Sequence, residues 1–286
     1  MISSAAPPRP AGASGRVIAA LGVLAAALVV AFVVAPPALT ADRAGGIVDR
    51  RDLSEALRAA FVAYWRSGDR DLPPDLARVV DYWSRYHLVK AVLAALLLTV
   101  LVALGFRLAR AFVTTGGLGA GKRAALAAAG VLVAVLAPFS LAMVMANVQG
   151  AVAPFASLLP MLTEGVTDAD LADTLTQVEQ GLAESGGTGG SSSPALDLMI
   201  DDFSWYHEAM AGTAAVVAVV LVATSVLAWR RFAATRPADR RRRQVLAAYG
   251  LLSALLLLPA VALAVANATT AADPAPALLA FFQGGW

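Results

Sequence analysis

Five apolar stretches of near-bilayer length dominate the pattern of hydrophobic and polar positions along this chain. A helix rises about 1.5 Å per residue, so about 20 apolar residues cross a hydrocarbon core about 30 Å thick. Helices are expected because a helix satisfies its own backbone hydrogen bonds in lipid. The alternation of apolar and polar residues that is typical of a membrane β-barrel is absent from the sequence. The predicted spans cover residues 17–36, 88–106, 125–146, 209–229 and 245–266.

Two polar segments between the spans show the periodicity of amphipathic helices. In the first, residues 37–87, Asp52 followed by Glu55 is typical of a helix N-terminus, and the next apolar residues share one face. The second, residues 161–207, holds another amphipathic stretch and then a Gly/Ser-rich run at 185–193, which predicts a flexible loop. We expect each segment to form a small helical cap on the membrane surface, and neither to bury a large core of its own.

These patterns predict an all-α, polytopic membrane bundle with five transmembrane helices. Short apolar segments follow the third and fifth spans. They are too short to cross the membrane, so we expect them to lie in its outer interface. The predicted parts are a cytoplasmic N-terminus at 1–16, a first span at 17–36, an outer helical segment at 37–87, a hairpin with its interfacial segment at 88–160, a second outer segment at 161–207, and a second hairpin with an interfacial C-terminus at 208–286.

Composition agrees with a membrane protein. The chain is 59% hydrophobic and 15% charged, and its mean hydropathy is +0.70, whereas soluble domains are about 45–50% apolar and about 25% charged. The sequence contains no cysteine, which excludes disulfides, thiolate metal sites and iron–sulfur clusters. Its two histidines leave few ways to build a metal or acid–base site. The dominance of arginine over lysine and the abundance of alanine are typical of a high-GC, actinobacterial genome.

Charge predicts how the helices are oriented, because cytoplasmic segments carry an excess of Lys and Arg. With the N-terminus inside, residues 1–16, 107–124 and 230–244 are cytoplasmic and hold 13 basic residues and one acid, Asp239. The rest of the chain holds 9 basic and 19 acidic residues. We therefore expect a plasma-membrane protein with its N-terminus in the cytoplasm and its C-terminus outside.

The first span has two interpretations. Arg9 and Arg16 precede an apolar run, and small residues follow it, as in a cleaved signal peptide. The run is longer than the usual signal core, and Pro36 and Pro37 crowd the cleavage zone, which favours an uncleaved anchor. The sequence leaves both open.

The two hairpins share a pattern at a fixed shift of 120 residues. When 74–159 is aligned with 194–279 without a gap, 31 of 86 positions are identical. Alanine and leucine inflate that number, but the polar matches do not share this bias. These matches are Asp81 with Asp201, Ser84 with Ser204, Tyr86 with Tyr206, His87 with His207 and Asn147 with Asn267. We infer a tandem duplication whose copies have the same orientation, as in the parallel repeats of some transporters.

The two histidines are the candidate functional residues. Near a pseudo-twofold axis, His87 and His207 could together bind a metal ion or the iron of a haem, with Asp81 and Asp201 as further ligands or partners. The competing interpretation places both histidines in an aromatic belt, where they anchor the helices at the outer interface.

The repeated D-x-x-S-x-Y-H motif also contains the residue types of a serine hydrolase. On a helix, Ser84 lies three residues from His87 and can touch it, but Asp81 lies about 120° away around the helix axis. No group that would form an oxyanion hole is recognisable. The sequence therefore disfavours, without excluding, an enzyme.

We expect a non-catalytic membrane protein that acts through its outer face, binding a protein partner as an accessory subunit of a cell-envelope complex. The spans are almost free of charge, which disfavours an ion-coupled transporter. Two alternatives stay open: haem or metal binding by the histidine pair, and passage of a small solute between the repeats. Asn147 and Asn267 are expected to cap helices or bridge neighbours.

A run of four arginines predicts contact with lipid. Arg240, Arg241, Arg242 and Arg243 lie beside the predicted cytoplasmic membrane surface and would attract anionic headgroups. Nucleic-acid binding is not expected from so short a loop between two spans.

Overall fold

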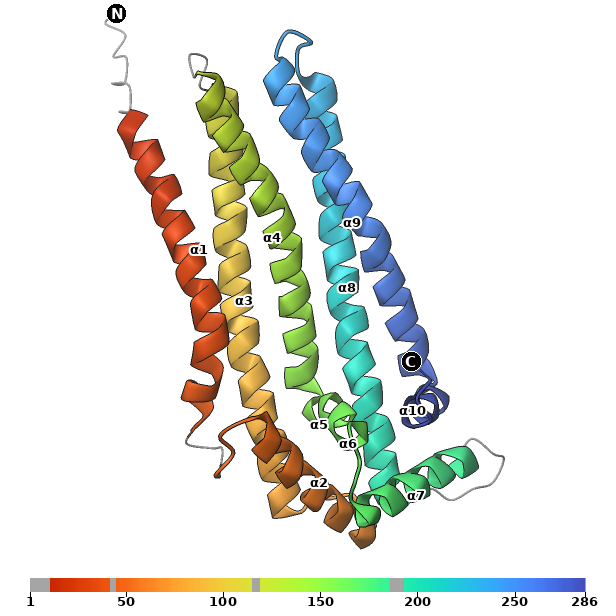
Figure 1. Ribbon diagram of the computed structural model, residues 1–286. Coiled ribbons are helices and arrows are strands. Elements are labelled where there is room, and N and C mark those ends of the chain that lie inside the picture. The colour runs from red at the N-terminus through yellow and green to blue at the C-terminus, as the bar shows by residue number, and fades with distance from the viewer. Residues whose placement is uncertain (1–10, 42–44, 115–118, 186–192, 286) are drawn as a thin grey trace, which may run out of the picture.

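The fold is all-helical throughout the part of the chain that the structure describes (Figure 1). The computed structural model describes residues 11–41, 45–114, 119–185 and 193–285. The loop expected at 185–193 lies outside the described residues, apart from its two ends. The prediction of an all-α chain is confirmed for these ranges.

Five long helices run side by side in Figure 1, and each is long and apolar enough to cross a membrane. Between 6% and 22% of the most apolar window of each helix is buried inside the protein, so most of its apolar surface faces outward, as lipid requires. The prediction of five candidate transmembrane helices is confirmed. They are α1 (Ala11–Thr40), α3 (Pro74–Thr114), α4 (Ala120–Val152), α8 (Pro194–Ala234) and α9 (Arg240–Ala272).

The long helices form two hairpins and one flanking helix. Helix α3 packs against α4 and α8 packs against α9, while α1 lies along α3 and the two hairpins meet chiefly between α4 and α8. Helices α3 and α8 have 41 residues each, and α4 and α9 have 33 each. A 41-residue helix is about 60 Å long, about twice the hydrocarbon thickness. Both α3 and α8 therefore extend beyond the spans, at the end where their N-termini lie.

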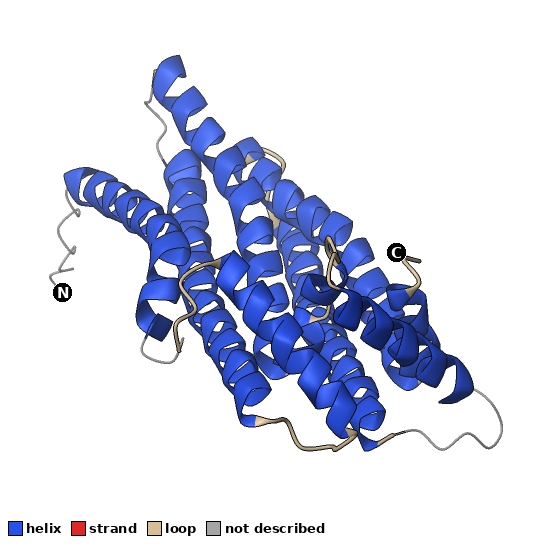
Figure 2. Ribbon diagram, turned by 60° about the horizontal axis from the view of Figure 1, so that its bottom comes forward, coloured by secondary structure: helices blue, strands red, loops and turns tan. Residues whose placement is uncertain are grey.

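Shorter helices gather around those N-termini and form what we call the cap (Figure 1). When that end is turned toward the viewer, the short helices lie across the ends of the long ones (Figure 2). The cap consists of α2 (Arg50–Ser67), α5 (Pro154–Leu158), α6 (Pro160–Thr163), α7 (Ala169–Ser185), α10 (Pro274–Phe282) and the first turns of α3 and α8.

Helix α2 begins one turn earlier than the sequence pattern suggested. Asp49 is the N-cap, and its Oδ1 accepts hydrogen bonds from the backbone N–H groups of Arg51 at 2.8 Å and Asp52 at 3.0 Å. The Asp52 carboxylate accepts in return from the Asp49 N–H, which completes a capping box. The helix begins at the earlier aspartate because Arg50 and Arg51, which lie between the two, are good helix formers.

The cap encloses a hydrophobic core that is formed by residues from both polar segments. Neither segment holds a large core alone, as expected, but α2, α5, α6, α7 and α10 bury their apolar faces together against the first turns of α3 and α8. Phe61 and Tyr64 of α2 pack on Phe155 of α5, with ring centroids 6.4 and 5.8 Å away. The Tyr64 hydroxyl, which is fully buried, donates a hydrogen bond to the Ala195 carbonyl at 2.9 Å. The cap is therefore a packed unit rather than a set of separate surface helices.

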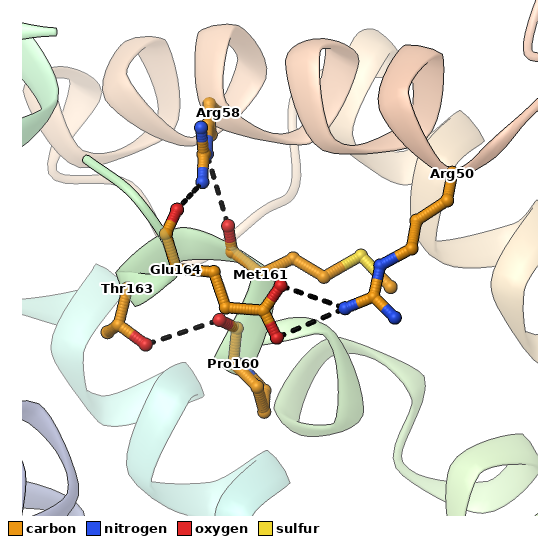
Figure 3. Close-up of polar contacts among 6 residues, drawn as sticks. All are labelled: Arg50, Arg58, Pro160, Met161, Thr163 and Glu164. Carbon is orange, nitrogen blue, oxygen red and sulfur yellow. Dashed lines mark hydrogen bonds and ion pairs between the residues drawn. The ribbon is translucent and has the colours of Figure 1, made fainter. Parts of the chain in front are cut away.

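Polar contacts also join α2 to the chain that follows α6 (Figure 3). One Arg50 Nη2 donates to both carboxylate oxygens of Glu164, at 3.0 and 2.8 Å. Arg58 donates from Nε to the Met161 carbonyl at 3.1 Å and from Nη2 to the Glu164 carbonyl. The two Arg58 bonds satisfy carbonyls at the end of the short helix α6, and together with the Arg50 ion pair they join this part of the cap to α2.

Candidate functional site

The two histidines lie where each hairpin meets the cap, and each bonds to an asparagine on the partner helix. His87 of α3 and Asn147 of α4 are joined by Nδ1 and Oδ1 at 3.0 Å. His207 of α8 and Asn267 of α9 make the same contact at 2.8 Å. The sequence placed all four residues at matched positions but did not indicate that they pair with one another.

The asparagines determine which ring nitrogen carries the proton. The Asn147 amide nitrogen donates to the Met143 carbonyl at 2.7 Å, and the Asn267 amide nitrogen donates to the Leu263 carbonyl at 2.9 Å. Because each NH₂ group is used on its own helix, each Oδ1 must face the imidazole and accept from it. Both rings are therefore assigned a proton on Nδ1 and a lone pair on Nε2.

A second pair of bonds repeats beside the first. The Ser84 hydroxyl donates to the Ala151 carbonyl at 2.9 Å, and the Ser204 hydroxyl donates to the Ala271 carbonyl at 2.9 Å. The motif serines thus tie each hairpin together one turn from its histidine. Each serine hydroxyl is bonded to a carbonyl of the neighbouring helix and not to the histidine, so the two side chains do not form a catalytic pair.

Both histidine Nε2 atoms are buried and have no hydrogen-bond partner among the described residues. A buried acceptor without a donor costs about 1–3 kcal/mol of stability. A residue that served only to join two helices would need the Nδ1–H and not this lone pair. The unused acceptors are therefore the feature of the site that structural bracing alone does not explain.

The two rings have different surroundings. His87 packs against Gly150 of α4, where an added Cβ would come within 2.8 Å of the ring, and its edge meets Trp83 at a centroid distance of 4.6 Å. Trp83 stacks on Tyr86 at 5.3 Å and donates to the Ser157 hydroxyl at 2.7 Å. His87, which is half-buried, thus packs against these aromatic rings on one side and against α4 on the other.

His207 lines a cavity of about 320 Å³ between the hairpin and the cap. The ring is 7% exposed and meets Phe203 at 4.6 Å and Tyr206 at 5.5 Å. The walls are apolar apart from His207 and Tyr206, and come from α5, α6 and the residue between them, and from α8 and α10. The lining residues are Ala156, Leu159, Pro160, Phe203, Tyr206, His207 and Phe281.

The acidic residues suggested as metal ligands pair with arginines. Asp81 accepts from Arg85 at 2.9 Å, and Asp201 accepts from Arg70 at 2.5 Å, with all four side chains roughly half exposed. Within the described ranges, no group of three or more His, Asp or Glu side chains is placed to hold a metal ion. In the same ranges, no hydrogen bond or ring contact joins the two histidines.

Three polar side chains contribute more than the sequence indicated. Gln149 donates to the Tyr206 carbonyl at 3.1 Å and links the two hairpins, and the Asp202 carboxylate accepts from the Ala156 N–H at 2.7 Å, at the start of α5. Lys90 is the exception to the near absence of charge in the predicted spans, because it lies within the span at 88–106. Its Nζ is 4.7 Å from the Phe32 ring centroid, a cation–π contact that joins α1 to α3 and that no spacing rule reveals.

Comparison with known proteins does not extend this picture. No protein-family model matches the sequence, and neither curated proteins nor solved structures give a significant match.

Proposed function

We propose that the chain is a non-catalytic integral membrane protein that acts through its cap, outside the cytoplasm, by binding a protein partner as an accessory subunit of a cell-envelope complex. The observation that carries this proposal is the single core of the cap, to which both hairpins contribute. A packed, polar-surfaced unit that sits on an otherwise lipid-facing bundle is the part of the molecule suited to specific protein contacts.

The proposed sidedness rests on charge. The connection between α8 and α9 and the start of α9, at the end of the bundle opposite the cap, hold five of the arginines. Basic residues favour the cytoplasmic side, which would place the cap outside and the N-terminus inside. Arg240, Arg241 and Arg242 would then attract anionic inner-leaflet lipid, at about 1 kcal/mol each. Arg243 has a further role, because it donates to the Phe232 and Thr235 carbonyls at the end of α8.

We further propose that the two hairpins arose by duplication. Helix pairs of equal length, the His–Asn bond and the serine-to-carbonyl bond all recur 120 residues apart. Since each copy contains an even number of spans, a duplication gives both the same orientation, with both histidines near the cap.

The absence of cysteine makes the sidedness directly measurable. Ala172→Cys in α7 and Ala238→Cys between α8 and α9 are matched single-cysteine variants at exposed alanines on opposite ends. In intact cells, a membrane-impermeant maleimide should label the first and should label the second only after permeabilisation. The reverse labelling would overturn the orientation.

The same two positions test the partner. A photo-crosslinking amino acid at Ala172 should give a discrete adduct with one other protein in native cells, and at Ala238 it should not. If the cap position yields no adduct and the purified protein is a solitary species, the accessory-subunit proposal fails.

A second candidate function is haem or metal binding by His87 and His207. The observation that favours it is the pair of unpartnered Nε2 lone pairs, because a metal-bound histidine also directs its other nitrogen to a hydrogen-bond partner. Gentle purification should then give a Soret band or a stoichiometric metal that is lost when both residues are replaced by Phe. A colourless, metal-free protein from native membranes would eliminate this candidate.

A further inference from the structure

We infer that the open face of α9 next to the cap is a docking surface for one transmembrane helix of a partner protein, and that this helix carries a Lys or Arg just outside the membrane. The inference rests on the proposed function, because it names where the protein partner binds and what it presents. It is argued from the contact between α4 and α8, from the side chains along α9 and from the charge of Asp273.

The first hairpin shows what covers the matched face of α4. Met145 and Gln149 of α4 and its C-cap, Ala153, are spaced four residues apart, and they are 7%, 5% and 0% exposed. Gln149 donates to the Tyr206 carbonyl at 3.1 Å, so this face of α4 meets α8. The half of α4 next to the cap is therefore shielded from lipid by a neighbouring helix.

The second hairpin leaves the same face open. The residues that match those three are Val265 and Thr269 of α9 and its C-cap, Asp273. All three are exposed, and Val265 is 58% exposed, whereas Met145 is 7% exposed. A surface that is continuous in pattern with the contact between α4 and α8 thus has no helix on it.

The side chains along α9 change where this open face begins. One exposed stripe, with residues three or four positions apart, runs along the helix. Away from the cap it consists of Leu251, Leu255 and Leu258, and next to the cap of Ala262, Val265 and Thr269. Leucine suits lipid tails, whereas small residues let two helix backbones approach closely and hydroxyls can bond across helices. The half of the stripe that matches the covered part of α4 is therefore suited to a protein neighbour.

Asp273 determines the charge of the partner. Its carboxylate is exposed where α9 meets α10, does not cap α10, and forms no ion pair with any described residue. In the first hairpin the matched Ala153 is uncharged, and α8 supplies the acid: Asp202 accepts from the Ala156 N–H at 2.7 Å. Pro276, which has no N–H, stands at the position that matches Ala156. An acid in the place of Asp202 would lose that donor and meet a like charge, whereas a Lys or Arg would pair with Asp273.

Site-specific photo-crosslinking in native cells tests the surface. A diazirine amino acid is placed at Val265 or Thr269, and, as a control, at Val92, an exposed residue of α3 that follows His87 by about one turn. Val265 and Thr269 should both crosslink to the same transmembrane segment of one other protein, and Val92 should not. Mass spectrometry of the crosslinked peptides should find a Lys or Arg within about two helical turns of the crosslinked residue, on its outer side.

Charge variants test the contribution of Asp273. Asp273→Lys should lower the adduct yield at Thr269 by up to about fivefold, the factor that corresponds to about 1 kcal/mol. Asp69→Lys is the matched control, because it makes the same charge change at an exposed residue between α2 and α3, and it should leave the yield unchanged. Yields are normalised to the amount of each variant in the membrane, so a variant that folds poorly is not counted as one that binds poorly.

The other possible occupants give distinct outcomes. Adducts with lipid alone, adducts with a second copy of this chain, a captured segment without the basic residue, or a yield that Asp273→Lys does not change would each overturn the inference. If Ala172 on the cap captures a protein while Val265 and Thr269 capture lipid only, the inference fails and the accessory-subunit proposal stands. If none of the three positions captures a protein, both fail.

Discussion

Replacement of Gly150 by alanine tests whether the His87 ring is held as tightly as the structure shows. Gly150 lies near the end of α4, and an added Cβ would come 2.8 Å from Cγ, 2.9 Å from Nδ1 and 3.0 Å from Cδ2 of His87. All three distances are shorter than ordinary van der Waals contact. The ring cannot easily move away, because Asn147 holds Nδ1 at 3.0 Å and the Trp83 ring packs against it in an edge-to-face contact.

The expected magnitude follows from three contributions. Overpacking of a tight site costs about 1–3 kcal/mol, and displacement of the ring would weaken a hydrogen bond worth about 1 kcal/mol. Alanine returns up to about 1 kcal/mol through its higher helix propensity, and less near a helix end. We expect Gly150→Ala to lower the free energy of unfolding by about 1–3 kcal/mol.

The assay compares two substitutions of the same kind in one helix. Gly130 also lies inside α4, but a Cβ there would meet nothing within 4 Å, so Gly130→Ala should leave stability unchanged or slightly raised. Unfolding in mixed micelles gives the free energies, and the [¹⁵N]histidine spectrum reports whether His87 keeps its proton on Nδ1. If Gly150→Ala matches the wild type in both measurements, the packing described for His87 is incorrect.

Three further predictions concern other parts of the molecule. Gly250→Ala should lower stability, because a Cβ at residue 250 would lie 2.8 Å from the Trp229 indole nitrogen, whereas a Cβ at the matched Gly130 meets nothing within 4 Å. Equal melting temperatures of the Gly250→Ala and Gly130→Ala variants would contradict this. Tyr64→Phe should cost about 1 kcal/mol near neutral pH, since it removes the buried bond to an α8 carbonyl. Burial raises the pKa of the Tyr64 phenol, so the wild type should lose stability as pH rises above about 10, and the variant, followed by unfolding at several pH values, should lose less. Arg70→Ala, which removes an exposed ion pair, should leave the melting temperature unchanged within error.

The histidine site shows how far sequence analysis reached. The repeated D-x-x-S-x-Y-H motif singled out His87, His207 and the serines, and the same alignment matched Asn147 with Asn267. Their pairing was not predictable, because residues 60 positions apart meet only when two helices pack at a particular register. The burial of Nε2 is likewise a property of packed neighbours.

Hydropathy alone determined the number, type and approximate position of the long helices, because each span must satisfy its backbone within one segment and bury its apolar surface in lipid. Both conditions are local, so they can be recognised along the sequence. The tertiary structure decided how the two polar segments pack their apolar faces into one core, and which aromatic rings lie against each histidine. Such features depend on side chains far apart in sequence, whose fit is determined only once the helices are packed together.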